Sequence, residues 1–175
     1  PAVLAHFESV RSDLIETAAT LIELEAQRPD GAPPALRLGS PFDRYEVNVL
    51  VTQPPGTTGA PLEEEHHPTL ANLVGRIEHL PVQGALVTNF RMIRPGALHR
   101  ANGGVLLLDA RDLLSEPFSW LALKRALTRQ RLVIEDGAQL VGLGSTVSLE
   151  PDPIPLDCKL VLVGERQAYA LLAAL

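Results

Sequence analysis

The sequence predicts an α/β fold in which helices flank a parallel β-sheet. Two apolar segments support this prediction: Val105–Leu108, which is closed by Asp109, and Lys159–Val163. Runs of this kind are typical of strands that are buried on both faces of a parallel sheet, so we expect both to be central. The signal Ser115-Glu116-Pro117 starts a helix after the first strand, as an α/β arrangement requires.

Residues 1–28 are expected to form a helix that resembles one strand of a coiled coil. Its apolar residues are Val3, Phe7, Val10, Leu14, Leu21 and Leu24, and Thr17 completes an alternating spacing of four and three. About three heptads are marginal in water, so this helix needs a partner. Two partners remain open: the rest of its own domain, or a segment upstream of Pro1. Residues 29–43, rich in Pro, Gly and Ala, are predicted to be a linker.

Residues 44–175 are predicted to form the α/β module. Valines alternate with polar residues over Tyr45–Val51, which predicts a strand with one covered face. Residues 53–68 are predicted to be a loop. Its run Glu63–His67 is not expected to bind a metal, because adjacent loop residues rarely point at one ion. Thr69 is expected to cap a short helix that Gly75 ends.

Several elements are predicted in the second half of the chain. Residues 84–93 are expected to form a strand and a loop before a helix at Pro95. Further strands are predicted at 132–134, 146–149 and 159–163, with a hairpin turn at 142–146 and a last helix at 167–175. The helix that follows Pro117 is expected to bury Phe118, Leu121, Leu123 and Leu127. Its basic residues form a solvated face or meet phosphates across a subunit boundary; they are Lys124, Arg125, Arg129 and Arg131.

Composition and charge exclude several classes of protein. The chain has 175 residues, 46% of them hydrophobic, which is enough to bury one core. Its formal net charge is −6 and its pI is near 5.3, so no basic stripe is available and nucleic acid is not an expected partner. No apolar run reaches the roughly 20 residues of a membrane-spanning helix. A single cysteine, Cys158, suits the cytoplasm.

Three segments together carry a family resemblance. They are NLVGRIEH (Asn72–His79), GALVTNFRMIRPGALHRANGGVLLLDA (Gly84–Ala110) and SLEPDPIPLDCKLVLVG (Ser148–Gly164). In this order and spacing, the chain from Arg44 onward resembles the AAA+ ATPase module of Lon-related, ATP-dependent proteases. Magnesium chelatases and enhancer-binding transcription activators share a looser form of the same string.

The resemblance implies roles for individual residues. Asp109 would be the acid of a Walker B strand, which binds the Mg²⁺ of a bound ATP. Glu165 would stand at the position of a polar sensor after the next strand. Phe90 and Met92 would grip protein substrate in the central pore of a homo-oligomeric ring; the alternative is that both simply pack beneath a hairpin. The long helical insertion of such relatives would account for residues 1–28.

Parts of the ATPase machinery are absent from the sequence. It has no G-x-x-x-x-G-K-[ST] loop for phosphates, and Ala110 stands where a water-orienting glutamate usually follows the Walker B acid. Either the phosphate loop lies upstream of Pro1 or nucleotide turnover has been lost. An isolated piece of such a sheet would expose a strand edge, so we expect it to self-associate or rearrange.

No catalytic residue is expected in this chain, since the Ser-Lys dyad of Lon-type proteases belongs to a separate domain. Cys158 suits a small core residue better than a thiolate, and His99 suits a helix-end hydrogen bond better than a base. The function implied is substrate handling in the ATPase module of a Lon-like serine protease, with protein fed to the protease domain. The alternative is a degenerate module that binds a protein or assembles a ring without nucleotide.

Overall fold

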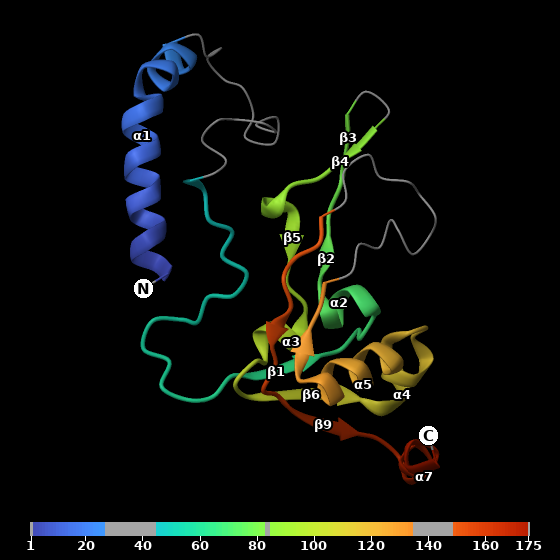
Figure 1. The fold of residues 1–175 in the computed structure, drawn as a ribbon. Helices are drawn as coiled ribbons and strands as arrows, with labels where there is room; N and C mark the ends of the chain where they lie inside the picture. Colours follow the sequence, from blue (N-terminus) through green and yellow to red (C-terminus); the bar gives the residue numbers. More distant parts are fainter. Residues whose placement is uncertain (1, 27–44, 83–84, 135–148, 175) are drawn as a thin grey trace. The chain divides into compact units, whose positions relative to one another are not determined.

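The computed structural model describes residues 2–26, 45–82, 85–134 and 149–174 (Figure 1). They belong to two compact units, Pro1–Val47 and Asn48–Leu175. The predicted linker and the predicted turn at 142–146 lie outside the described residues. Of the strand predicted at 146–149, only the last residue lies within the described residues. In the part of the chain that the structure describes, no helix is long and apolar enough to cross a membrane.

The first unit contains α1, which spans Ala2–Ala26. Apolar side chains at the start of its seam are exposed, among them Val3 and Phe7. Near the middle of the helix the Thr17 hydroxyl donates a hydrogen bond to the Asp13 carbonyl oxygen, and the Tyr45 hydroxyl donates one to the Asp13 carboxylate. A helix thus occupies the predicted segment, while the partner of its seam stays a prediction.

The strand predicted over Tyr45–Val51 is wrong, because the structure has no strand there. Val47 and Val49 are exposed instead of covering a core. The Asn48 side-chain amide donates hydrogen bonds to the carbonyl oxygens of Phe90 (2.9 Å) and Ile93 (3.1 Å). Alternation alone therefore failed as a strand signal in this segment, since a strand also needs a neighbour with which to pair.

The second unit is built on a parallel three-stranded sheet with the order β1-β6-β9 (Figure 1). Its strands are β1 (Leu62–Glu65), β6 (Val105–Asp109) and β9 (Lys159–Val163). The prediction that β6 is central is confirmed. For β9 it is wrong among the described strands, because β9 pairs with β6 alone and its outward side chains are exposed.

The acidic run predicted to lie in a loop forms the edge strand β1. Glu63 and Glu65 lie on one face of the strand and both accept hydrogen bonds from the Arg100 guanidinium, Glu65 at 3.2 Å. Arg100 lies at the end of helix α3 (Ala97–Arg100) and is itself partly buried. This pairing compensates the two acidic side chains, so the backbone of a charged segment can add a strand to the sheet.

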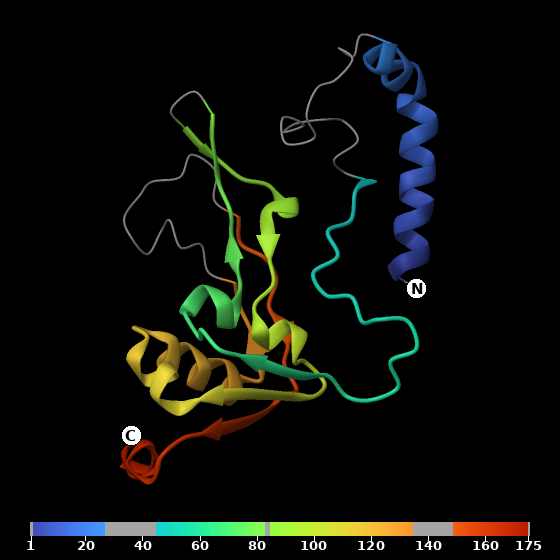
Figure 2. The same ribbon diagram turned by 180° about the vertical axis from the view of Figure 1, so that it is seen from behind.

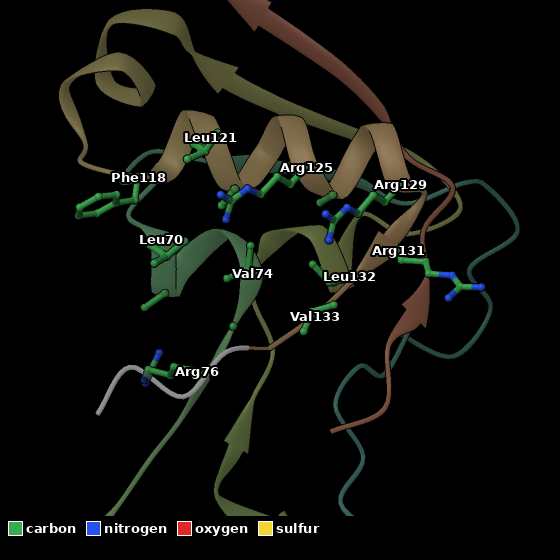
Figure 3. A pocket seen from close by; sticks show the side chains of 14 residues that line it. Leu70, Val74, Arg76, Phe118, Leu121, Arg125, Arg129, Arg131, Leu132 and Val133 are labelled. Atoms are coloured by element: carbon green, nitrogen blue, oxygen red, sulfur yellow. The ribbon is translucent and has the colours of Figure 1, made fainter. Parts of the chain in front are cut away.

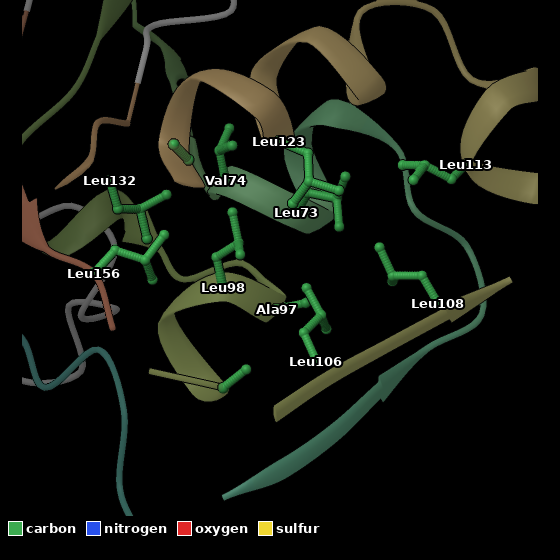
Figure 4. Packing of buried hydrophobic residues seen from close by; sticks show 12 residues of the cluster. Leu73, Val74, Ala97, Leu98, Leu106, Leu108, Leu113, Leu123, Leu132 and Leu156 are labelled. Atoms are coloured by element: carbon green, nitrogen blue, oxygen red, sulfur yellow. The ribbon is translucent and has the colours of Figure 1, made fainter. Parts of the chain in front are cut away.

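Helices cover one face of this sheet. The short helix α2 (Leu70–Val74) is capped by Thr69 and ends at Gly75, as predicted. The Thr69 side chain accepts a hydrogen bond from the Asn72 N–H, and Gly75 has a φ of 87°. Leu73 of α2 packs with Leu106 and Leu108 of β6 and with Leu123 of helix α5 (Ser119–Arg129) (Figure 4). The remaining buried members of this core are Val74, Ala97, Leu98, Ala101, Leu113, Ala126, Leu132 and Leu156.

The segment that follows β6 differs from the prediction. A helix, α4 (Ala110–Ser115), begins directly after the strand, and the predicted start signal instead separates α4 from α5. Phe118 is 73% exposed with φ 65°, whereas Leu123 is fully buried as predicted. The C-terminal helix α7 (Arg166–Ala174) lies where a helix was expected.

Antiparallel ribbons complete the second unit. Strands β2 (Arg76–Ile77) and β5 (Ile93–Arg94) pair and lead away from the helices to the hairpin of β3 (Leu80–Val82) and β4 (Ala85–Val87) (Figure 2). The turn η3 (Phe90–Met92) connects β4 to β5. Strand β7 (Arg131–Leu132) overlaps the strand predicted at 132–134, and pairs with β8 (Ile154–Pro155) in the proline-rich segment.

Candidate functional site

Asp109 ends β6 at the carboxyl edge of the sheet, where parallel α/β folds bind ligands. Its side chain is exposed and caps α4: Oδ1 accepts hydrogen bonds from the backbone N–H groups of Arg111 (2.8 Å) and Asp112 (3.2 Å). The Asp109 carboxylate therefore has a structural role as a helix cap. Both capping bonds use one oxygen, so Oδ2 remains available to a cation.

The predicted sensor residue lies at the same edge, one strand away. Glu165 follows β9, and its carboxylate pairs with the Arg111 guanidinium across 2.7 Å. Both side chains are about 70% exposed, so this pair adds little stability. The partner of Glu165 is thus Arg111, two residues beyond Asp109, and the sequence did not predict this pair.

The position after Asp109 is buried and lies close to the residue that follows β9. Ala110 is 2% exposed. A Cβ added to Gly164, the residue after β9, would lie 3.0 Å from the Ala110 Cβ, which is closer than nearly all real contacts. The backbones therefore approach closely at this point.

His99 forms a hydrogen bond at the end of a helix, as the sequence predicted, and its side chain is buried. Its Nδ1 accepts a hydrogen bond from the Gly96 N–H at 3.1 Å, so the neutral ring carries its proton on Nε2. Burial, with a smaller contribution from the neighbouring Arg100 charge, lowers the His99 pKa to about 4. A side chain at Gly96 would clash with the backbone of Leu73 and Gly75, so this corner is tightly packed.

Cys158 is likewise poorly suited to nucleophilic chemistry. It is partly buried, and its Sγ lies 3.6 Å from the Lys159 carbonyl oxygen. Desolvation is the main cause that raises the pKa of its thiol. The thiol is therefore protonated at neutral pH. Among the described residues, no group of three or more His, Cys, Asp or Glu side chains could hold a metal ion.

Phe90 and Met92 lie in η3, away from the carboxyl edge of the sheet (Figure 2). Both side chains are partly buried. The Asn89 side chain accepts a hydrogen bond from the Arg91 N–H at 3.0 Å, and the Asn48 amide holds the Phe90 carbonyl. The turn thus has a fixed backbone, while its two apolar side chains remain in partial contact with solvent.

The β2–β5 ribbon that carries this turn is clamped by charge. Glu78 accepts hydrogen bonds from Arg94 and Arg76, each at 2.8 Å. The bond from Arg94, the larger effect, and then that from Arg76 hold the pKa of Glu78 below its usual value. The clamp is exposed and therefore weak, but it ties the two strands together at the base of the ribbon.

A groove that the sequence did not predict lies between α2, α5 and the segment 131–133 (Figure 3). We call it the arginine-rimmed groove; its volume is about 540 Å³. Its lining is mostly apolar, with arginines at the rim: Leu70, Ala71, Val74, Gly75, Arg76, Phe118, Leu121, Ala122, Arg125, Ala126, Arg129, Arg131, Leu132 and Val133. The available signal was the spacing of Leu121, Arg125 and Arg129, which places them on one stripe of α5.

Comparison with known protein families agrees with this architecture. Residues 58–175, well over half of the chain, match the family described as "LonB-like, AAA domain". The chain belongs to this family. The resemblance to the AAA+ module of Lon-related proteases is thereby confirmed, as is the α/β fold with a parallel sheet and flanking helices. The LonB-like AAA domain includes β1, β6 and β9, and so includes the carboxyl edge that carries Asp109.

A curated relative is similar to part of this LonB-like AAA domain. The "Putative Lon protease homolog" of Escherichia coli (strain K12) is 35% identical over 80 residues, which is 45% of this chain and 13% of that protein. The chain therefore spans a small fraction of this relative's length. Among solved structures, NtrX from Brucella abortus covers 66% of this chain and 22% of its own, at 18% identity and a TM-score of 0.39.

Proposed function

We propose that this chain handles protein substrate in the ATPase module of a Lon-type, ATP-dependent serine protease. The observation that carries the proposal is the match of residues 58–175 to the LonB-like AAA domain. In the proposal the parent protein is cytoplasmic, assembles into a homo-oligomeric ring and uses ATP and Mg²⁺. It feeds protein to a separate Ser-Lys protease domain.

In this proposal Asp109 is the Mg²⁺ ligand that the chain contributes. Its position at the end of β6 and its second carboxylate oxygen suit a hard cation that prefers oxygen ligands. Bound Mg²⁺ neutralises charge on the nucleotide phosphates. The sequence has no phosphate-binding lysine loop, so in this proposal the phosphates are held by residues of the parent protein outside this chain. Arg111 holds Glu165 beside this position.

Phe90 and Met92 are proposed to contact the protein substrate. Their support is the geometry of η3, in which hydrogen bonds from Asn48 and to Asn89 fix the backbone beneath two partly exposed apolar side chains. A rigid turn loses little conformational entropy when it binds an unfolded chain. Apolar contacts are non-directional, so these two side chains can bind polypeptides of many different sequences, as a substrate-handling loop requires.

The test is degradation of an unfolded model protein by the full-length protein, with and without ATP. The double variant Phe90→Ala/Met92→Ala is expected to lower the rate of degradation while ATP hydrolysis continues, because substrate contact is lost and the nucleotide site is untouched. Tyr169→Ala, which removes an aromatic ring that is 76% exposed on α7, is the matched control. Unchanged degradation by the double variant would contradict the roles of Phe90 and Met92.

A second candidate is a degenerate AAA domain that binds a protein or assembles a ring without nucleotide. Ala110 favours it, because a buried alanine stands where a water-orienting acid usually follows the Walker B acid. The capping role of Asp109 also accounts for that residue without a metal. This candidate predicts no ATP hydrolysis by the full-length protein and binding of an unfolded protein that is unaffected by ATP. Degradation that requires ATP would exclude it.

A further inference from the structure

The arginine-rimmed groove combines an apolar interior with an apolar rim at one end. Val74, Ala126 and Leu132 are buried in its floor. Leu121 and Val133 line its walls, and each keeps more than two-fifths of its side chain in contact with solvent. Phe118 lies at the end nearest Leu121 and Leu70 (Figure 3). This is more exposed apolar surface than an isolated surface residue would give, and such patches commonly mark binding sites.

Arginines line the rim of the groove. Arg125 and Arg129 project from α5 toward the space beside α2, whereas Arg131 lies in β7, beyond the end of α5, and its side chain points away from them (Figure 3). Arg76 pairs with Glu78, but the other three arginines form no ion pair with any carboxylate of the described residues. Because the whole chain carries a net charge of −6, these unpaired guanidiniums are a local exception.

Phe118 is the N-cap of α5 and has an unusual backbone conformation. Its φ is 65° and its ψ is −14°, a left-handed conformation that is uncommon for a bulky side chain. The side chain is 73% exposed, so the burial of its ring does not offset the cost. Residues in sparsely populated backbone conformations cluster at active sites and ligand-binding sites, so this conformation supports a role for Phe118 in binding.

We propose that the arginine-rimmed groove binds an acidic peptide segment of a partner protein, with one large apolar side chain at one end of the segment. The apolar side chain packs against Phe118, Leu121 and Leu70, and the carboxylates pair with Arg125 and Arg129. From Phe118 to Arg129 the helix rises about 16 Å, which an extended peptide spans with about five residues. This site is separate from the turn at Phe90 and does not depend on nucleotide.

Charge and shape favour a short acidic peptide over other anions. A long polyanion such as RNA would meet the net charge of −6 beyond the groove and would find no continuous basic track. A fatty acid would fill the apolar end but carries one carboxylate for the two unpaired arginines that face the groove, Arg125 and Arg129. A peptide with several carboxylates forms multiple charge-assisted hydrogen bonds, and arginine provides these in paired geometry.

The test is fluorescence polarisation of the labelled peptide Phe-Glu-Asp-Glu-Glu with the full chain. The double variant Arg125→Glu/Arg129→Glu is expected to bind at least about tenfold more weakly, because two attractive contacts become repulsive. Phe118→Ala is expected to weaken binding about threefold to tenfold. Arg166→Glu, at the exposed start of α7, is the matched charge control and leaves binding unchanged. Phe90→Ala/Met92→Ala also leaves it unchanged, which separates this site from the proposed substrate turn.

Three results would overturn the proposal. The first is equal binding of Phe-Lys-Lys-Lys-Lys or of Gly-Glu-Asp-Glu-Glu, which lack the acids and the apolar side chain respectively. The second is displacement of the acidic peptide by oleate or anionic vesicles at lower concentration than by unlabelled peptide, which would assign the groove to a lipid. The third is unaltered affinity of the arginine variant. Thermal melting checks that each variant folds, and Arg125→Gln/Arg129→Gln replaces the glutamate pair if that pair does not.

Discussion

The two faces of the β1-β6-β9 sheet differ in how completely they are covered. Leu106 and Leu108 of β6 are almost fully buried beneath α2 and α5, and Leu160 and Leu162 of β9 pack against the same core (Figure 4). On the opposite face Val161 and Val163 are 44% and 54% exposed. Side chains alternate along a strand, so the same apolar segments supply both faces. Apolar sequence therefore identifies a strand without showing how much covers it.

The largest effect should come from a matched pair of substitutions in β6. Leu106→Ala removes a fully buried side chain from the core and is expected to lower the free energy of unfolding by about 2–5 kcal/mol. The Leu107 side chain lies on the opposite face and is only partly buried, so Leu107→Ala should lower the free energy of unfolding clearly less. Chemical denaturation measures both. Equal losses would mean that the second face is covered as well as the first.

The covered side should also be sensitive to pH through His99. Its pKa is about 4 in the folded chain and about 6.5 when unfolded, so the unfolded state takes up the proton first as the pH falls. Stability is therefore complete above about pH 6.5 and declines toward pH 4, by up to about 3 kcal/mol. His99→Asn should remove this component of the decline, whereas replacement of exposed His67 should not. An unchanged pH profile in His99→Asn would show that the ring is not protected from protonation.

The uncovered face should control self-association. The β9 edge and its exposed valines offer both backbone and apolar surface to a second copy, so the isolated chain is expected to form oligomers. Val161→Lys/Val163→Lys should shift it toward the monomer in size-exclusion chromatography with light scattering. Val47→Lys/Val49→Lys, which alters two exposed valines outside any strand, is the control. A monodisperse wild-type monomer would contradict the prediction.

The smallest effect is expected away from the sheet, at the clamp on the β2–β5 ribbon. Glu78→Gln keeps a hydrogen-bond acceptor but removes the charge that pairs with Arg76 and Arg94. The loss in unfolding free energy should be below about 1 kcal/mol and should diminish at high salt. A loss of several kcal/mol, measured by thermal melting, would mean that this exposed pair stabilises the ribbon far more than surface ion pairs usually do.

Much of the covered side could be predicted from local sequence. The cap at Thr69, the break at Gly75 and the central strand Val105–Asp109 all depend on short patterns with a direct physical cause. The hydrogen bond at His99 was predicted for the same reason. These features are determined mainly by residues within a few positions of each other.

Features that depend on distant residues were missed. The acidic segment Glu63–Glu65 forms a strand because Arg100, far along the chain, pairs with two of its carboxylates. Neither alternative for the arginines of α5, a solvated face or contact with phosphates across a subunit boundary, includes a groove, because only the fold brings α2 and the segment after α5 opposite them. Asp109 belongs to both groups: its place at the end of a strand was predicted, but its role as the cap of α4 was not.

The most direct test of the proposed ATPase role compares Asp109→Asn with Asp109→Ala in the full-length protein. Asparagine caps a helix about as well as aspartate but lacks the charge that binds Mg²⁺, whereas alanine lacks both. ATP-stimulated degradation and thermal melting are measured for each variant. If Asp109 binds Mg²⁺, Asp109→Asn melts like the wild type and loses ATP stimulation. If Asp109→Asn retains stimulation while Asp109→Ala loses stability, the residue is only a helix cap and the proposed nucleotide role is wrong.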